Sequence, residues 1–198
     1  MRTLLIDNYL PNSPQIEHLY NVIKDITIHT VEVVEYSSIN AGEEFKQYDA
    51  VVLSGSQHKL AESEVYESYL NEAEFLENTQ KPVLGICFGH QLLAMAFGEE
   101  VVVLDNNYEG YYIVNKITND VIFDGLDEKF LVMESHTEMV KDLPSNFVLL
   151  GDSPNCPIEV IKHRLYTLYG VQFHPERFDE RHPAGYKILE NFFKVATW

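Results

Sequence analysis

Apolar runs alternate with stretches of helical periodicity along the first half of the chain. Four short runs rich in apolar residues predict strands, at 3–7, 31–36, 50–53 and 82–86. Between them, apolar residues recur at the spacing of one helix face, first at Ile16, Leu19, Tyr20 and Ile23 and then from Val65 to Leu76. Ser13 and Pro14 predict the start of the first of these helices, as its N-cap and its first helical residue. Such alternation is typical of a parallel sheet with helices on both faces.

After residue 99 the pattern changes to short apolar runs separated by Asn, Asp, Gly and Pro, which predicts antiparallel or mixed strands. These runs lie at 101–104, 111–115, 130–133, 147–150, 157–162 and 165–173. Residues 105–108 have the composition of a turn, and a last helix is predicted over 184–195. We therefore predict a single α/β domain over residues 1–198, with an open, mostly parallel twisted sheet, flanking helices and an added small antiparallel sheet.

Acidic residues outnumber basic residues by 31 to 14, which gives the 198-residue chain a formal net charge of −17 at pH 7. This balance argues against nucleic acid as a partner, because binding to phosphates requires a basic surface. Apolar residues make up 45% of the chain and aromatic residues 12%, which is too much for a disordered acidic segment. We expect a folded protein that binds no nucleic acid.

Nothing in the sequence indicates a membrane. The N-terminal apolar run reaches only to Asp7 and is too short for a signal peptide. No stretch approaches the roughly 18–20 uncharged apolar residues of a membrane span. The two cysteines, Cys87 and Cys156, cannot form a disulfide framework and lack the spacing of metal ligands. We expect a cytoplasmic protein with no metal site, in which a thiol either fills the core or carries chemistry.

Chemistry is indicated most strongly at Cys87. Residues 85–91 read GICFGHQ, at the end of one predicted strand and the start of the helical stretch 91–97. Glycines two residues before and two after a nucleophile allow a tight strand-to-helix turn in which larger side chains would collide. Such an elbow places the sulfur at the carboxyl end of a strand and at a helix N-terminus, which favours the thiolate. The alternative is that Cys87 is a small core residue, the usual fate of an intracellular cysteine.

A base for this thiol is predicted at His174. Residues 169–176 read YGVQFHPE, and Pro175 stops the strand, so that the imidazole emerges at the strand end. Glu176 can bond the distal ring nitrogen, which leaves the other nitrogen to face a thiol. Together these residues predict a triad of Cys87, His174 and Glu176. The histidines without such a setting are interpreted as surface residues: His18, His29, His58, His163 and His182.

Residues 85–91 and 173–176, in this order and at this separation, resemble the two motifs of the class I (triad) glutamine amidotransferases. The similarity extends over nearly the whole chain. Within the family, the pattern is most similar to the glutaminase subunits of two-subunit GMP synthases, on the strength of Glu109-Gly110, residues 135–140, which read SHTEMV, and residues 169–176. The resemblance implies a flavodoxin-like α/β fold.

The resemblance implies hydrolysis of L-glutamine to glutamate and ammonia through a thioester. Cys87 would be the nucleophile, His174 would transfer protons and Glu176 would orient the imidazole. The implied oxyanion hole combines the backbone of Phe88 with the loop that contains Gly55 and Ser56. Three further residues are implied to contact the substrate: Gln91, Ser135 and His136, the last two as a backbone clamp on its α-amino-acid end.

The family also implies a partner. The sequence contains neither a Ser-Gly-Gly-x-Asp-Ser pyrophosphatase loop nor a Walker A loop. No cofactor is therefore expected on this chain, and ATP and Mg are expected only on a separate synthetase. The implied partner is an ATP-pyrophosphatase subunit in trans, which uses the ammonia to make GMP from XMP.

Two positions depart from the family pattern. The oxyanion loop usually reads Ser-Gly-Gly-Pro, whereas residues 54–57 read SGSQ. If the second glycine position requires a positive φ, Ser56 is strained by about 1 kcal/mol or more. Gly98 is followed by Glu99, where the family commonly has a second glycine, but Gly98 can still end the preceding helix.

Two other functions stay open on the sequence alone. A stand-alone γ-glutamyl hydrolase or peptidase would share the fold and the triad, and the altered loop 54–57 favours it, because this loop borders the leaving-group side of the substrate. A catalytically idle regulatory protein would retain the fold, but the intact triad argues against it. The ammonia-producing subunit is the function that we expect.

Overall fold

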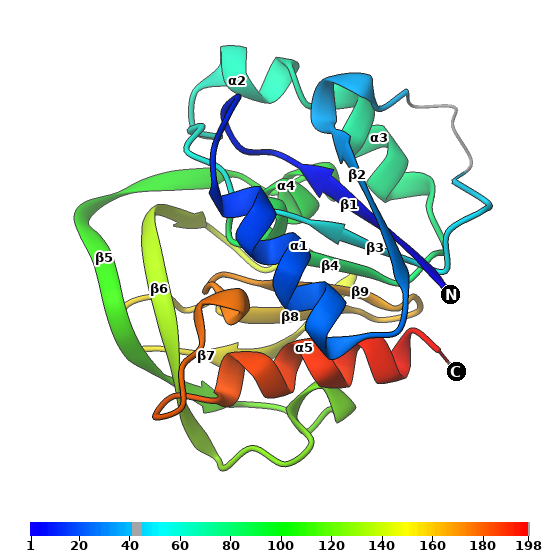
Figure 1. Ribbon diagram of the computed structural model, residues 1–198. Helices are drawn as coiled ribbons and strands as arrows, with labels where there is room; N and C mark the ends of the chain where they lie inside the picture. Colours follow the sequence, from blue (N-terminus) through cyan, green and yellow to red (C-terminus); the bar gives the residue numbers. More distant parts are fainter. Residues whose placement is uncertain (41–44, 198) are drawn as a thin grey trace.

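A computed structural model describes residues 1–40 and 45–197. In this part of the chain, nine strands form one mixed sheet in the order β2-β1-β3-β4-β9-β8-β7-β5-β6 (Figure 1). The strands are β1 (Arg2–Asp7), β2 (Thr30–Glu35), β3 (Ala50–Leu53), β4 (Val83–Ile86), β5 (Val101–Lys116), β6 (Lys129–Val140), β7 (Phe147–Asp152), β8 (Val160–His163) and β9 (Leu168–Val171). The helices are α1 (Gln15–Ile26), α2 (Ser63–Glu67), α3 (Leu70–Asn78), α4 (Phe88–Ala96) and α5 (Ala184–Val195), with 3-10 turns η1 (Tyr36–Ser38), η2 (Val121–Phe123) and η3 (Pro175–Arg177).

The parallel half of the sheet positions the site. Strands β2, β1, β3, β4 and β9 pair in parallel, and every residue of β3, β4 and β9 is buried. Ile86 at the end of β4 is in register with Val171 at the end of β9. The carboxyl ends of these two strands therefore lie side by side, and the segments that follow them leave the sheet at the same edge.

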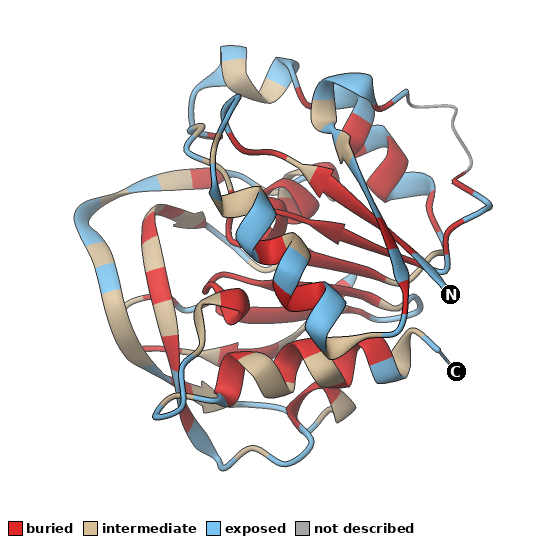
Figure 2. Ribbon diagram, in the orientation of Figure 1, coloured by how far each residue is buried: buried red, intermediate tan, exposed pale blue. Residues whose placement is uncertain are grey.

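Helices cover both faces of the sheet, as the alternating pattern predicts. One core packs α1 and α5 against the sheet, through residues such as Leu19 and Phe192. The other packs α3 and α4 against the opposite face, through residues such as Leu76 and Leu92. Figure 2 shows the buried side of each helix facing the strands. The predicted α/β class is confirmed.

The antiparallel half differs from the prediction in how it is attached. Strands β8, β7, β5 and β6 are antiparallel as expected, but they continue the main sheet instead of forming a small second sheet. The turn predicted at 105–108 is also wrong, because these residues lie within the long strand β5. The pairing of β5 with β6 shifts register between Val103 and Tyr108, so the Asn and Asp residues occupy an irregularity in a strand.

Smaller differences concern the helices. The helix predicted over Val65 to Leu76 is divided into α2 and α3. Helix α1 begins at Gln15, and Pro14 occupies its N-cap position without a side-chain capping bond, so Ser13 does not cap it. Within residues 1–40 and 45–197, no helix has the length and apolar character to cross a membrane.

Two of the five histidines interpreted as surface residues are buried. His29 hydrogen-bonds the hydroxyl of Thr3 through Nδ1 at 2.9 Å. His163 accepts hydrogen bonds at Nδ1 from the backbone N–H groups of residues 165 and 166, both at 3.1 Å. Each ring is thus accommodated in the core by a partner that the sequence pattern does not reveal.

Candidate active site

Cys87 forms the turn between β4 and α4. Its φ of 51° and ψ of −100° lie outside the regions that ordinary residues favour. The flanking glycines are required by close packing: a Cβ on Gly85 would lie 2.5 Å from the carbonyl oxygen of Gly89, and a Cβ on Gly89 would lie 2.6 Å from the Cβ of Leu53. The structure therefore has the strained strand-to-helix elbow that the sequence predicts.

His174 and Glu176 lie at the end of the neighbouring strand β9 and in the turn η3. His174 donates its backbone N–H to the carbonyl of Met133 on β6 at 2.8 Å. Its Nδ1 lies 2.7 Å from Oε1 of Glu176, and both side chains are buried. The ring also makes a hydrogen bond with the Cys87 side chain. Because Nδ1 is engaged by Glu176, it is Nε2 that faces the sulfur, so the three predicted triad residues are brought together.

The charges in this group stabilise one another. Burial by itself lowers the pKa of His174, but the charges of Glu176 and Cys87 outweigh burial and raise that pKa to about 10. Burial raises the pKa of Glu176, but the charge and hydrogen bond of His174 outweigh it and hold the pKa below its usual value. Arg177, whose Nε lies 3.7 Å from Oε1 of Glu176, adds to the same effect. At neutral pH the pair is therefore an imidazolium and a carboxylate.

The loop after β3 lies against the imidazole. A Cβ on Gly55 would lie 2.9 Å from Cε1 of His174, so only glycine fits here without displacing the ring. The strain predicted at Ser56 is wrong, because the described non-glycine residues with positive φ are only Asn12 and Cys87. Gln57 accepts a hydrogen bond from the N–H of Leu10 at 3.1 Å and so ties this loop to the one after β1.

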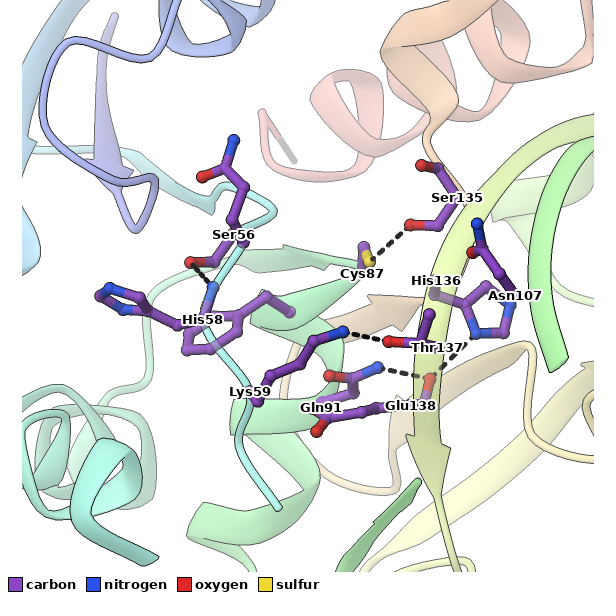
Figure 3. Close-up of a pocket in the computed structure, with 12 residues that line it drawn as sticks. Ser56, His58, Lys59, Cys87, Gln91, Asn107, Ser135, His136, Thr137 and Glu138 are labelled. Carbon is purple, nitrogen blue, oxygen red and sulfur yellow. Dashed lines mark hydrogen bonds between the residues drawn. The ribbon is translucent and has the colours of Figure 1, made fainter. Parts of the chain in front are cut away.

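A cavity of about 260 Å³ opens next to Cys87 (Figure 3). Six of the nine predicted site residues line it: Ser56, Cys87, Phe88, Gln91, Ser135 and His136. The three others, Gly55, His174 and Glu176, lie beside Cys87 in the contacts described above. At this volume the cavity is at the small end of ligand pockets, which suits a ligand of amino-acid size.

The residues predicted to contact substrate are held by the protein itself. Gln91 on α4 donates through Nε2 to the carbonyl of Glu138 at 2.8 Å and to Oε1 of Gln172 at 3.2 Å. The carbonyl oxygen of Ser135 lies 3.9 Å from Sγ of Cys87. His136 donates from Nδ1 to the carbonyl of Glu138 at 2.9 Å. These bonds join α4 to β6 and fix the wall of the cavity opposite the loop after β3.

Sequence reasoning missed several residues of this site. Gln172 donates from Nε2 to Sγ of Cys87 at 3.7 Å, and its position two residues before His174 was a usable signal. Lys59 reaches across the cavity to hydrogen-bond the hydroxyl of Thr137 (Figure 3). Glu134 and Glu159 are buried behind the cavity wall, and no local pattern indicates that they meet. Contacts between distant segments account for all three omissions.

Comparisons with known proteins agree with this geometry. The glutamine-hydrolysing subunit of the GMP synthase of Archaeoglobus fulgidus is 32% identical over 197 residues, which cover 99% of each chain. The corresponding subunit of Pyrococcus abyssi is 44% identical over 129 residues, covering 64% of this chain and 68% of that protein. A crystal structure assigned to a GMP synthase subunit from Thermoplasma acidophilum has a TM-score of 0.86 at 26% identity and covers 100% of this chain and 94% of its own.

A glutamine amidotransferase from Thermotoga maritima supports the fold alone, with a TM-score of 0.77 at 21% identity over 98% of this chain and 97% of that one. At the level of families, residues 4–196 match Glutamine amidotransferase class-I, which is nearly the whole chain. The strained cysteine elbow, the buried imidazole and carboxylate beside it and this match lead to one conclusion: the chain belongs to the class I glutamine amidotransferases.

Proposed function

We propose that this chain is the glutamine-hydrolysing subunit of a two-subunit GMP synthase, with Cys87, His174 and Glu176 as its catalytic triad. The observation that carries the proposal is the strained Cys87 elbow, which faces a buried, charged His174–Glu176 pair and opens into an amino-acid-sized cavity. The relatives named as glutamine-hydrolysing subunits of GMP synthase support the choice of acceptor.

In the first half of the proposed reaction, Sγ of Cys87 attacks the side-chain amide carbon of glutamine, and the carbonyl electron pair moves onto oxygen. Backbone N–H groups of Phe88 and Ser56 are assigned to this oxyanion. The carbonyl then re-forms as the C–N bond breaks, and the departing nitrogen takes a proton from the His174 imidazolium. The products are ammonia and a γ-glutamyl thioester on Cys87.

In the second half, water attacks the thioester carbon while His174, now neutral, accepts a proton from that water. The C–S bond breaks, glutamate leaves, and the thiolate and imidazolium are restored. Glu176 keeps the ring oriented through its 2.7 Å hydrogen bond and favours the charged form of the ring throughout. Gly55 leaves the space that the ring occupies.

The ammonia needs an acceptor that this chain does not supply in the proposal. We assign ATP, Mg²⁺ and XMP to an ATP-pyrophosphatase subunit bound in trans, with no cofactor on this chain. We place the reaction in the cytoplasm, because a catalytic thiolate has to stay reduced.

The test is release of glutamate and ammonia from glutamine by the purified chain, first by itself and then with a GMP synthase ATP-pyrophosphatase subunit, ATP, Mg²⁺ and XMP. We expect glutamine turnover that rises when the partner is complete, and formation of GMP. Vigorous cleavage of γ-glutamyl dipeptides without any partner, with glutamine as a poor substrate, would contradict the proposal and identify a stand-alone hydrolase.

A further inference from the structure

A second carboxyl–imidazole pair is buried behind the wall of the active-site cavity. Glu134 and His136 lie on β6, on either side of Ser135, and Oε2 of Glu134 is 3.2 Å from Nε2 of His136. Both side chains are buried, as is that of Glu159, which precedes β8. The proposed hydrolysis of glutamine uses neither carboxyl group.

The hydrogen bond at the other ring nitrogen fixes where the His136 protons lie. Nδ1 is 2.9 Å from the carbonyl oxygen of Glu138, and a carbonyl oxygen can only accept. Nδ1 therefore carries a hydrogen, so Nε2 of a neutral ring is bare. A bare Nε2 at 3.2 Å from Glu134 requires a protonated carboxyl, and a protonated Nε2 matches a carboxylate. In either state one proton lies between the two groups.

The neighbouring carboxyl keeps this proton in place. Glu134 and Glu159 hydrogen-bond each other, and two carboxylates in contact in the protein interior do not both ionise readily. Burial and the charge of Glu134 raise the pKa of Glu159 well above its usual value. Burial also raises the pKa of Glu134, to about 7, although its hydrogen bond with Glu159 opposes that rise. The two carboxyl groups and the ring are together uncharged near neutral pH.

We propose that Glu134 and His136 share this buried proton, and that the shared proton holds segment 135–138 in the conformation that lines the substrate cavity. Glu134 is then a positioning residue. The inference rests on the proposed function, because this wall matters for turnover only if the cavity takes glutamine. It adds a role for two side chains behind the clamp, which contact neither the sulfur nor the triad carboxylate.

The contacts of segment 135–138 show how the proton would act. The carbonyl of Glu138 accepts from both Nδ1 of His136 and Nε2 of Gln91. The carbonyl of Ser135 faces the sulfur of Cys87. If Glu134 ionises beside a neutral His136, its charge repels the bare Nε2 and favours rotation of the ring, which releases its bond to the Glu138 carbonyl. The wall between Gln91 and Ser135 then loses its internal tie.

Other ionisable groups also face this cluster, and they decide the direction of its pH dependence. They are His90 on α4, Lys59 on the loop after β3, His174 after β9 and Cys156 before β8. The positive charge of His174 favours ionisation of Glu134, whereas burial opposes it more strongly. The substrate site is therefore expected to weaken as pH rises above about 7.

The experiment compares Glu134→Gln with the wild type and with Glu100→Gln. Glu100 is an exposed carboxyl paired with Lys141 and serves as the matched control. An amide at position 134 donates to a bare Nε2 but cannot give up its proton, so it keeps the hydrogen bond and removes the titration. The two readouts are the pH profile of KM for glutamine and the protonation state of His136 from long-range ¹H–¹⁵N spectra, assigned with His136→Gln.

We expect KM of the wild type and of Glu100→Gln to rise about tenfold between pH 6 and 9, and KM of Glu134→Gln to stay flat, with kcat nearly unchanged. The His136 ring of the wild type should carry its hydrogen on Nδ1 whenever it is neutral. A neutral ring protonated at Nε2, or a KM profile of Glu134→Gln that follows the wild type, would overturn the inference. The spectra decide on the shared proton even if glutamine is not hydrolysed, a result that would count against the proposed function instead.

Discussion

The two carboxyl–imidazole pairs of this site have the same side chains and the same burial, yet they differ in charge. In each pair the histidine side chain is 3% exposed and the glutamate side chain 2% exposed. In the pair of His174 and Glu176, the pKa of the ring is raised to about 10 and that of the carboxyl is lowered. In the pair of His136 and Glu134, burial lowers the pKa of the ring and raises that of the carboxyl to about 7.

The groups around each pair explain the difference. Glu176 lies near the cation of Arg177, and His174 faces the sulfur of Cys87, so opposite charges surround both members. Glu134 faces a second carboxyl, that of Glu159, and no comparable charge among the described residues compensates the burial of its ring partner. The comparison teaches that burial alone does not set the charge state of such a pair. The neighbouring charge decides between a catalytic ion pair and a neutral, proton-sharing pair.

Removal of the sulfur should have the largest effect. Cys87→Ser deletes the nucleophile and the negative charge beside His174, so we expect glutamine hydrolysis to fall by about 10⁴-fold or more and the pKa of His174 to decrease. Initial rates of glutamate release and histidine NMR measure the two effects. Cys156→Ala, which removes the other buried thiol, is the matched control and should retain turnover. Comparable loss in both variants would contradict the assignment of Cys87.

Neutralising the triad carboxyl should make the first pair resemble the second. Glu176→Gln removes the charge that raises the pKa of His174, so we expect kcat to fall by about 10² to 10⁴-fold. The wild type should lose activity only as pH rises toward about 10, where the ring gives up its proton. In Glu176→Gln this loss should begin at lower pH. A pH profile of kcat/KM measures the shift, and an unchanged alkaline limb would show that Glu176 does not charge the ring.

A smaller effect is expected from His18 on α1. Its Nε2 donates to the carbonyl of Glu176 at 3.0 Å, so an exposed histidine supports the turn that carries the first pair. We expect His18→Ala to lower kcat/KM about three- to tenfold, because one hydrogen bond to the turn is lost. His182→Ala removes a ring beyond the triad that bonds Asp179 and stacks on Tyr111, and it is the comparison variant. Equal activity of both variants would exclude His18 as a support.

The smallest expected effect is on stability. Because the pKa of Glu134 is raised in the folded state, the fold binds more protons than the unfolded chain between about pH 4.5 and 7, and stability falls as pH rises through that interval. Glu134→Gln lacks this titration. Its free energy of unfolding should therefore gain about 1–3 kcal/mol on that of the wild type between pH 5 and pH 8, as measured by urea titration. A constant difference would mean that Glu134 is ionised throughout.

The same contrast separates what the sequence predicts from what it does not. The elbow around Cys87 and the strand end at His174 are predictable, because glycine spacing, an apolar run and a proline are local signals. The pair of Glu134 and Glu159 is not, since its members meet only through the pairing of distant strands. The irregular pairing within β5 was missed for a similar reason: its Asn and Asp residues favour a turn locally, and pairing with β6 overrides that preference.

Local rules also mislead where the backbone has room to adapt. Ser56 replaces a glycine of the family pattern, but it does not adopt a positive φ, and the residue that needs to be glycine is Gly55, because of the imidazole next to it. A sequence motif records which residues occur in a loop. Only the packing shows which of them lacks space for a side chain.

The most direct test of the account is to trap the covalent intermediate. Purified protein is mixed with glutamine, quenched in acid within its first turnovers and digested for mass spectrometry. The account predicts a γ-glutamyl adduct on the peptide that contains Cys87, absent in Cys87→Ser and enriched in a variant of Glu176 that slows hydrolysis of the thioester. Glutamine hydrolysis that persists without Cys87, or an adduct on Cys156 instead, would contradict it.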